Sequence, residues 1–456
     1  MLSKVKSKRI IIVGGNAAGP SAAAKAKRVD PNADVIMFEA GDFISTGTCE
    51  LPYLISGDIK DYKKIVFFDE NSFLEKKGVK VFTNHLVENI NSKNKSITVK
   101  NLIDGSDQIF SYDKLILSTG SVVKKIPTLS DSIQNLFYLK TVSNYLQIKN
   151  YCDSNNVQNV LIIGASFIGL ETADAFRMTG KNVIVIDSRE HPMPNSEVEI
   201  QHLIKNTLAE HDVKFLGNAG ATNYIIGENR LKGFKFEGRM IDVDLVLVAI
   251  GFAPNSLLAI KANLEMGVFG GIKVDNKQKT SDPNIFACGD NTEVINKITN
   301  RPDYLPIATF AHQQGHVAGA NAAGAFEFSK PVIKNIAVKI FDKTFTSVGL
   351  TSSEVNSLKY NSKSVSDITN NIIKVMPESG KVYGKIIFNS DTKQILGASF
   401  YGTDEVIGYA DLISSFIQNR IPGDKLSEVS FNYTPPKSPF INLLSILGRK
   451  IDKEKI

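Results

Sequence analysis

Two segments of the sequence repeat one arrangement of glycines followed by an acid. The first is Gly14-Gly15-Asn16-Ala17-Ala18-Gly19 with Glu39 downstream, and the second is Gly164-Ala165-Ser166-Phe167-Ile168-Gly169 with Asp187 downstream. A tight glycine turn lets the backbone approach a pyrophosphate at a helix N-terminus, and an acid about 20 residues later accepts a hydrogen bond from a ribose hydroxyl. Asn16 and Ser166 replace the middle glycine of the usual motif. Because the turn and its acid occur twice, the sequence predicts two nucleotide-binding sites.

Cys49 is the cysteine best placed for redox chemistry. It lies between Gly47-Thr48 and the predicted start of a helix at Glu50-Leu51-Pro52-Tyr53. The positive end of a helix favours a thiolate, whereas the negative charge of Glu50 opposes it, and the sequence does not decide between them. Cys152, in a polar stretch interpreted as a linker, and Cys288, at an apolar strand end, are expected to be structural.

The elements that must position these groups follow from the hydrophobic pattern. Strands are predicted at residues 9–13 and 34–38, and again at 160–163 and 182–186, with a helix inside each pair. Two further strands end at glycine corners, Ser118-Thr119-Gly120 and Ala249-Ile250-Gly251, and a third closes on Gly289-Asp290. From about residue 331, strands at 337–341, 381–388 and 395–401 precede a helix at 404–419. The predicted fold class is α/β, with two interleaved Rossmann-like domains followed by a C-terminal α+β domain.

Composition excludes several other classes of protein. The chain has 456 residues, 43% of them apolar and 22% charged, which indicates several globular domains. The formal net charge is only +6, so no nucleic-acid partner is expected. No apolar stretch is long enough for a membrane span or a signal peptide, and three scattered cysteines are typical of a reduced, cytoplasmic protein. The histidines show no metal-ligand spacing, and no metal is expected.

Taken in order, these motifs resemble the flavoprotein disulfide reductase superfamily over the whole chain. The stretch from Ser45 to Tyr53, together with Thr83-Asn84-His85 and Asn432-Tyr433-Thr434-Pro435-Pro436, is similar to its single-cysteine branch, which contains coenzyme A disulfide reductase and NADH oxidase. The resemblance implies an FAD-binding domain at 1–120 and 252–330, an NAD(P)H-binding domain at 121–251 and a C-terminal dimerisation domain at 331–456, in a homodimer.

The resemblance also implies cofactor contacts. FAD is expected at Gly14, Gly19 and Glu39, with Asp290 on its ribityl chain and the helix starting at Ala308 facing its ring. NADH or NADPH is expected at Gly164, Gly169 and Asp187, with Phe167 covering the flavin and Glu171 near the nicotinamide. Further cofactor-binding residues are expected to be Gly15, Ala18, Thr119, Gly120, Ile168, Gly251 and Gly289.

The function implied by the resemblance is NAD(P)H-dependent reduction of coenzyme A disulfide or a related small disulfide or polysulfide. Cys49 is then the redox-active residue, and Tyr433 acts in the partner's site. Lys25, Lys27 and Arg28 are the expected coenzyme A contacts, although the His-Ala-x-Tyr-Tyr-Pro motif of such reductases is replaced by Lys374-Val375-Met376-Pro377.

Two alternatives remain open at this point. One is an NADH oxidase or peroxidase that works through a cysteine sulfenate, and Ala17 disfavours it because those enzymes carry a histidine there. The other is a non-enzymatic flavoprotein redox sensor.

Overall fold

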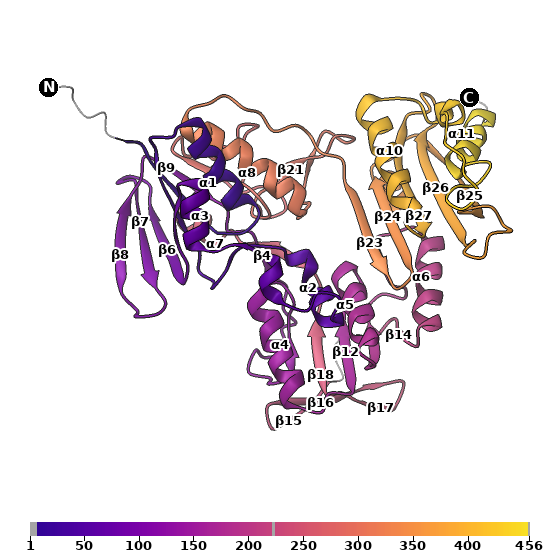
Figure 1. Ribbon diagram of the computed structural model, residues 1–456, viewed down its shortest axis with the longest axis horizontal. Coiled ribbons are helices and arrows are strands. Elements are labelled where there is room, and N and C mark those ends of the chain that lie inside the picture. Colours follow the sequence, from indigo (N-terminus) through magenta and orange to yellow (C-terminus); the bar gives the residue numbers. More distant parts are fainter. Residues whose placement is uncertain (1–6, 221–223, 455–456) are drawn as a thin grey trace.

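The chain forms three regions, each built on its own five-stranded sheet (Figure 1). The computed structural model describes residues 7–220 and 224–454. The N-terminal region and the C-terminal region lie on opposite sides, and the second nucleotide-binding region lies between and below them in Figure 1. Among the described residues, no helix has the length and apolarity needed to cross a bilayer.

The first sheet has the strand order β20-β9-β1-β2-β5, and all its neighbouring strands are parallel. Its strands are β1 (Arg9–Val13), β2 (Asp34–Phe38), β5 (Lys80–Phe82), β9 (Lys114–Leu117) and β20 (Ile285–Ala287). Their nearly continuous apolar sequences suit a parallel sheet covered on both faces. Helices α1 (Ala18–Val29) and α8 (Ala308–Ala323) pack tightly together, since a Cβ added at Gly315 or Gly319 would come within 2.2 Å of the α1 backbone.

The second sheet repeats this plan in the order β11-β18-β12-β13-β14. Its strands are β11 (Leu136–Phe137), β12 (Asn159–Ile163), β13 (Asn182–Ile186), β14 (Lys214–Leu216) and β18 (Leu245–Val248), again all parallel. Helices α4 (Val142–Ser154), α5 (Phe167–Met178) and α6 (Val198–Glu210) belong to this region. In both sheets the strand before the glycine turn is central, which confirms the prediction of two Rossmann-like units.

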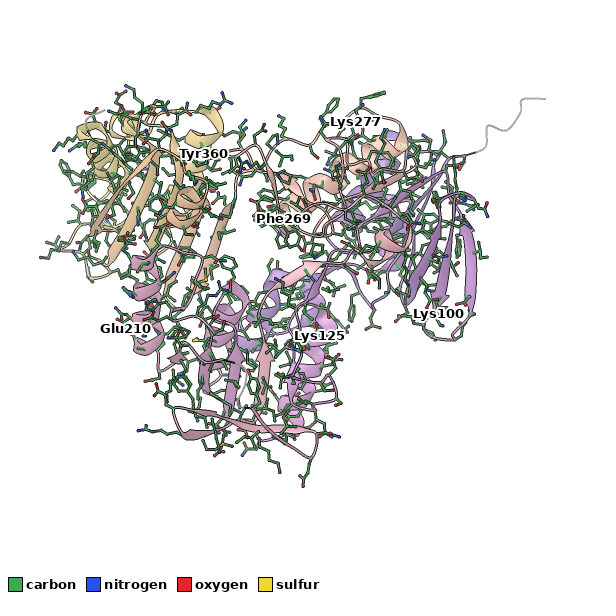
Figure 2. The ribbon with its side chains drawn as sticks, turned by 180° about the vertical axis from the view of Figure 1, so that it is seen from behind. Lys100, Lys125, Glu210, Phe269, Lys277 and Tyr360 are labelled. Carbon is green, nitrogen blue, oxygen red and sulfur yellow. The ribbon has the colours of Figure 1, made fainter. Side chains whose placement is uncertain are left out.

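The two regions are joined where the chain crosses between them. β10 (Ser121–Val123) pairs antiparallel with β19 (Phe252–Pro254), so the outgoing and returning segments lie side by side. β20 then rejoins the first sheet, which confirms that the two domains are interleaved. Figure 2 shows these regions from behind, with Lys125 just after β10, and with Lys100 on an outer hairpin of the first region.

Several small elements were not predicted from the sequence. Antiparallel sheets form from β6 (His85–Asn91), β7 (Ser96–Asn101) and β8 (Asp107–Ser111), and from β15 (Tyr224–Gly227), β16 (Arg230–Phe236) and β17 (Arg239–Asp242). Two-stranded pairs join β3 (Ile44–Thr46) to β4 (Val66–Phe68) and β21 (Val294–Ile295) to β22 (Pro302–Asp303). The short helices that were not predicted are η1 (Thr48–Glu50), η2 (Tyr62–Ile65), α3 (Glu70–Lys77) and α7 (Leu257–Lys261). The predicted helix start at Glu50 is confirmed, because α2 (Leu51–Ser56) begins directly after that residue.

The C-terminal region is an antiparallel sheet with helices, which confirms the predicted α+β block. Its strand order is β23-β24-β27-β26-β25, from β23 (Asn335–Ile340), β24 (Lys343–Gly349), β25 (Ser362–Asn370), β26 (Lys381–Asn389) and β27 (Ile395–Gly402). The helices are α9 (Ser352–Ser357), α10 (Glu405–Asn419), η4 (Gly423–Glu428) and α11 (Leu443–Lys453). The sequence had indicated three of these strands and had missed β24 and β25, which are rich in Ser, Thr and Asn.

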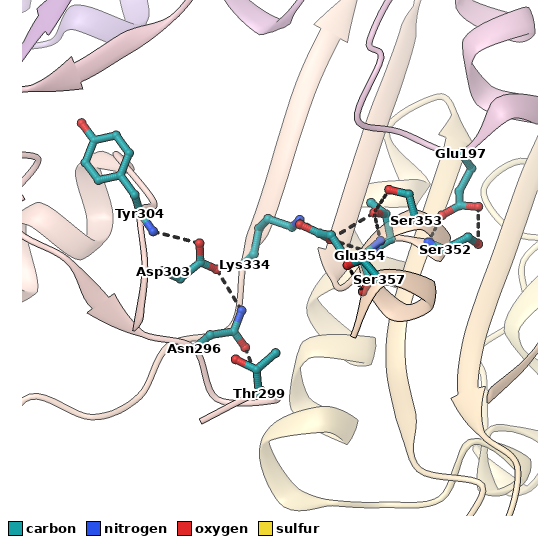
Figure 3. A network of polar contacts seen from close by, with 11 residues as sticks. Glu197, Asn296, Thr299, Asp303, Tyr304, Lys334, Ser352, Ser353, Glu354 and Ser357 are labelled. Atoms are coloured by element: carbon teal, nitrogen blue, oxygen red, sulfur yellow. Dashed lines mark hydrogen bonds and ion pairs between the residues drawn. The ribbon is translucent and has the colours of Figure 1, made fainter. Parts of the chain in front are cut away.

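Buried polar contacts attach this region to the second nucleotide-binding region. The Glu197 carboxylate, just before α6, accepts hydrogen bonds from the Ser352 backbone N–H at 2.8 Å and the Ser352 hydroxyl at 2.7 Å (Figure 3). The Lys385 ammonium on β26 lies 2.7 Å from the same carboxylate. The start of α6 is thereby fixed against the antiparallel sheet.

Candidate active site

The first glycine turn is held by backbone contacts that only small residues permit. Gly14 has φ of +106°, and its N–H donates to the Phe38 carbonyl at 2.8 Å. A Cβ at Gly19 would lie 1.9 Å from the Gly14 oxygen, so the start of α1 sits directly on the turn. The Glu39 carboxylate accepts hydrogen bonds from the N–H groups of Gly15 at 2.6 Å and Gly41 at 2.7 Å. These two bonds orient the acid and leave its other lone pairs for a ligand.

The second turn reproduces this geometry. Gly164 has φ of +108°, and its N–H donates to the Ile186 carbonyl at 2.8 Å. A Cβ at Gly169 would lie 1.9 Å from the Gly164 oxygen. The Asp187 carboxylate accepts from the N–H groups of Ala165 and Arg189, both at 2.9 Å. The predicted acids therefore occupy equivalent positions in the two units.

The helix N-termini at these turns have no side chain bonded to their free N–H groups. α1, α5 and α8 lack side-chain caps, whereas α3, α4 and α9 each begin with a complete capping box. Uncapped N–H groups beside a glycine turn suit an anionic group such as a pyrophosphate. The residues present therefore fit a dinucleotide at each turn.

Asp290 lies at the end of β20, near the start of α1. Gly289 brings it there, since a Cβ at Gly289 would be 2.9 Å from the Ala18 Cβ, and the Gly289 N–H donates to the Gln314 side chain at 2.8 Å. Burial raises the pKa of Asp290, while the Lys140 charge and a 3.0 Å hydrogen bond from the Ser121 hydroxyl oppose that shift. The half-buried carboxylate thus retains acceptor capacity toward the first nucleotide site.

Three polar residues around Asp290 were not found by sequence reasoning. The Lys140 ammonium donates to the Ser121 hydroxyl at 2.8 Å and lies 4.4 Å from the centre of the Phe252 ring. Gln314 ties α8 to the β20 end. No sequence motif marks them, because each lies on a different segment and they meet only through the interleaved crossings.

The predicted residues at the crossings differ in their contacts, since Thr119 forms hydrogen bonds and the two glycines border open space. The Thr119 hydroxyl donates to the Asn255 carbonyl at 2.7 Å and accepts from the Asn291 amide at 3.0 Å, so it joins the crossings. Gly120 and Gly251 have positive φ, and a Cβ added at either would meet open space. The turns require the positive φ of these glycines, and no neighbouring atom fills the space where a side chain would lie.

Cys49 is an exposed residue of η1, directly before α2, and α2 packs against α5. Desolvation of the thiol, followed by the negative charges of Glu50, Glu171 and Asp290, raises its pKa. These effects together favour the neutral thiol over the thiolate in the protein alone. Glu171 comes from the second unit and Asp290 from the first, so Cys49 lies under the influence of both.

The other two cysteines have structural surroundings. Cys288 is fully buried beneath the first sheet, as predicted. The prediction that Cys152 lies in a linker is wrong, because it belongs to α4 and packs against the hydrophobic core. Its apolar neighbours Tyr145 and Ile148 supply the helical face that the polar composition concealed. No group of three or more potential metal ligands occurs within residues 7–220 and 224–454.

The remaining predicted site residues lie on α5, on α1 and in a loop of the C-terminal region. Phe167 and Ile168 form the half-buried first turn of α5. On α1, Lys25 pairs with Glu327 at 2.7 Å, Lys27 donates to two backbone carbonyls, and Arg28 is exposed. Tyr433 is 47% exposed in a loop of the C-terminal region and packs edge-on against Phe440.

Comparisons with known proteins agree with this architecture. The family model described as pyridine nucleotide-disulphide oxidoreductase matches residues 8–315. NADH oxidase from Methanocaldococcus jannaschii is 28% identical over 96% of this chain and 97% of its own length. Coenzyme A disulfide reductase from Staphylococcus aureus is 28% identical over 97% and 99%.

A solved structure gives the same result. The reduced CoADR-RHD of Bacillus anthracis superimposes with a TM-score of 0.93 at 30% identity, covering 99% of this chain and 81% of that one. The predicted resemblance and the predicted enzyme class are confirmed. The chain belongs to the pyridine nucleotide-disulphide oxidoreductase family.

Proposed function

We propose that the protein is an FAD-dependent NAD(P)H:disulfide oxidoreductase whose single redox thiol is Cys49. The observation that carries this proposal is the position of the thiol: it is exposed, and charged groups from both nucleotide-binding units, Asp290 and Glu171, act on it. A thiol that receives electrons from NAD(P)H by way of FAD has to lie close to the place where the two nucleotide sites meet.

The first glycine turn, the Asp290 strand end and the start of α8 hold FAD in this proposal, and the second turn and α5 hold NADH or NADPH. FAD, when bound, accepts hydride from the nicotinamide and passes an electron pair to sulfur. Residues 1–120 and 252–330, 121–251 and 331–456 are proposed as the FAD, NAD(P)H and dimerisation domains. The tight packing of α1 on α8 and the two uncapped helix ends support the first assignment.

The Cys49 thiolate attacks one sulfur of the substrate disulfide. A new S–S bond forms between Cys49 and that sulfur, the substrate S–S bond breaks, and the other sulfur leaves as a thiolate that takes up a proton. Two electrons from NAD(P)H, delivered through FAD, would then break the mixed disulfide, releasing the second substrate sulfur as a thiolate that takes up a proton and regenerating the Cys49 thiolate. Desolvation and the neighbouring acids raise the pKa of the Cys49 thiol and lower its thiolate fraction, so a change in the surrounding charges when ligands bind would favour the attack.

We propose a homodimer in the cytoplasm, with Tyr433 supplying a phenol to the partner's site. The exposed aromatic pair Tyr433 and Phe440, with the neighbouring exposed Ile441, is suited to an interface. Tyr433→Phe is expected to leave reduction by NADH intact and to slow the step at Cys49, since the hydroxyl protonates the leaving sulfur.

Coenzyme A disulfide is the proposed substrate, with other small disulfides or polysulfides as the wider class. Similarity to a coenzyme A disulfide reductase over 97% of the chain supports it. Of the basic residues on α1, Arg28 is exposed, while Lys25 and Lys27 would have to exchange their present partners for nucleotide phosphates.

The second candidate function is reduction of oxygen or peroxide through a Cys49 sulfenate, supported by the similarity to an NADH oxidase. Parallel NAD(P)H-consumption assays with coenzyme A disulfide, polysulfide, oxygen and peroxide separate the two. We expect coenzyme A disulfide to give the largest specificity constant, Cys49→Ser to abolish it, and the matched control Cys152→Ser to retain it. Oxygen as the preferred acceptor would favour the oxidase, and flavin reduction without turnover on any acceptor would favour a sensor.

A further inference from the structure

A recess of about 120 Å³ lies where α2, α5 and β23 meet, the junction of the three regions (Figure 1). Its ionisable lining residues are Tyr53, Asp58, Glu171, Asp174 and Lys339. Three carboxylates and a phenol thus face one ammonium, in a space with room for a few water molecules. Glu171 and Asp174 are the more shielded members, so their charges act on each other with little screening, whereas Asp58 and Lys339 are exposed to solvent.

Asp174 is the fixed member of this cluster. It is buried on α5, and its carboxylate accepts a hydrogen bond from the Phe341 backbone N–H at 3.0 Å. The Lys339 ammonium lies 3.4 Å from the same oxygen. Phe341 and Lys339 both belong to the C-terminal region, so its first strand determines how the Asp174 charge is compensated.

Glu171 lies one helical turn before Asp174 on α5. Among the described residues, no hydrogen bond holds its carboxyl. Burial and then the Asp174 charge raise the pKa of Glu171 to about 7, and Lys339 opposes this. The charge on Glu171 in turn raises the pKa of both the Cys49 thiol and the Tyr53 phenol.

The groups that face Glu171 can be traced to each element packed against α5. Tyr53 comes from α2 and Asp58 from the loop after it, Lys339 comes from β23, and Asp174 comes from α5 itself. β12 and β13, which also pack against α5, contain no charged residue. Among these groups, Lys339 is therefore the cation and Asp174 the fixed anion that can shift the ionisation of Glu171.

We propose that Lys339 and Asp174 are positioning residues that set the charge on Glu171 and, through it, how readily Cys49 forms a thiolate. The C-terminal sheet thereby adjusts the reactivity of a thiol in another region of the chain. This inference rests on the proposed function in taking Cys49 as the reacting thiol, and it does not depend on the identity of the disulfide.

The sign of each effect follows from the charges. Below the pH at which Glu171 ionises, the neutral carboxyl no longer repels a Cys49 thiolate. The logarithm of the rate of Cys49 alkylation should therefore rise with pH, flatten into a shoulder near pH 7, and then rise again. Loss of the Lys339 charge moves the shoulder to higher pH, and loss of the Asp174 charge moves it to lower pH.

The test is the pH dependence of iodoacetamide labelling of Cys49 in the full chain, followed on the Cys49 peptide by mass spectrometry. Asp174→Asn should lower the shoulder by about one pH unit, and Asn can still accept from the Phe341 N–H. Lys339→Gln should raise it by less, because this side chain is 52% exposed and its charge is screened. Glu171→Gln should remove the shoulder and speed labelling.

Lys334→Gln is the matched control, since Lys334 pairs with Glu354 at 2.9 Å in the same region (Figure 3) and does not line the recess. Its shoulder should stay at the wild-type pH. Shifts of Asp174→Asn and Lys339→Gln in the same direction, or a shoulder that persists in Glu171→Gln, would overturn the proposal. Labelling needs neither NAD(P)H nor a disulfide, so failure of the proposed reductase function would appear separately, as absent turnover with the opposite shifts intact.

Discussion

The two nucleotide-binding units have nearly identical turns in different surroundings. Gly14 and Gly164 have φ values of +106° and +108°, and a Cβ at either would come within 2.5 Å of a backbone oxygen on the neighbouring strand end. The acid of each unit holds two backbone N–H groups in the same way. The turn itself therefore cannot explain why one protein needs both units.

The surroundings provide the distinction. Around the first turn, Gly289 and Gly315 bring distant backbone segments against Ala18, and no large side chain lies between them. Around the second, α5 starts with Phe167 and Ile168, and the Arg189 side chain lies 3.8 Å from Asp187 with 59% of its surface exposed. We infer that the first unit holds a permanent cofactor between closely packed backbone segments. In the second unit, side chains that can change their rotamers surround a coenzyme that binds and dissociates.

The largest effects are expected from one methyl group placed in each turn. Gly19→Ala and Gly169→Ala would each put a Cβ 1.9 Å from a turn oxygen. Because such overpacking costs about 1–3 kcal/mol or more, we expect each site to weaken at least about fivefold. Gly19→Ala should purify with less FAD than the wild type, while Gly169→Ala should keep its full FAD content and need more NAD(P)H for reduction. Flavin content and NAD(P)H titrations check this, and flavin loss from both variants alike would remove the distinction.

A smaller effect should separate the acids. Asp187 favours the free ribose hydroxyls of NADH and repels a 2′-phosphate, with Arg189 beside it to compensate. Asp187→Ala should therefore shift the ratio of NADPH to NADH specificity constants by about tenfold toward NADPH, without changing flavin content. Glu39→Ala is the matched variant in the first unit and should change flavin content alone. An unchanged coenzyme ratio in Asp187→Ala would place selectivity elsewhere.

A third effect, on stability and not on ligand binding, concerns attachment of the second unit. Glu197 and Lys385 form an ion pair with side chains 3% and 13% exposed. Burial lowers the pKa of Lys385, but the charges of Glu197 and then Glu199 outweigh burial and hold this pKa above its usual value. Glu197→Gln should cost about 3 kcal/mol and lower the unfolding temperature of the second unit in calorimetry, with FAD retained. The exposed pair Lys273–Glu265 gives the control, since Lys273→Gln should change stability by less than about 1 kcal/mol. Equal losses would contradict a buried attachment.

The parts of the molecule that depend on local sequence could be predicted. A glycine turn such as Gly164 to Gly169 predicts a strand, a tight corner and a helix within a few residues, and the structure contains these elements. Polar antiparallel strands such as β25 carry no comparable pattern, because an edge strand needs few apolar residues. Neighbours of Asp290 such as Ser121 and Lys140 also escaped prediction, since their contacts depend on chain crossings far apart in sequence.

The Cys49 segment shows the same limit. Its motif identified the thiol, but the competition between the helix and Glu50 could not be settled from neighbouring residues. The structure adds Glu171 and Asp290, from distant segments, and their charges raise the pKa of the thiol together with desolvation. The acidity of the Cys49 thiol therefore depends on residues from three segments that only the folded chain brings together.

The central claim is that Cys49 connects the two nucleotide sites to the substrate. Its most direct test is rapid anaerobic mixing of wild type and Cys49→Ser, first with NADH and then with coenzyme A disulfide, following the flavin absorbance. We predict equal loss of absorbance with NADH in both proteins, and recovery on adding the disulfide in the wild type alone, because a serine hydroxyl cannot form a mixed disulfide. Full recovery in Cys49→Ser at the wild-type rate would contradict the account.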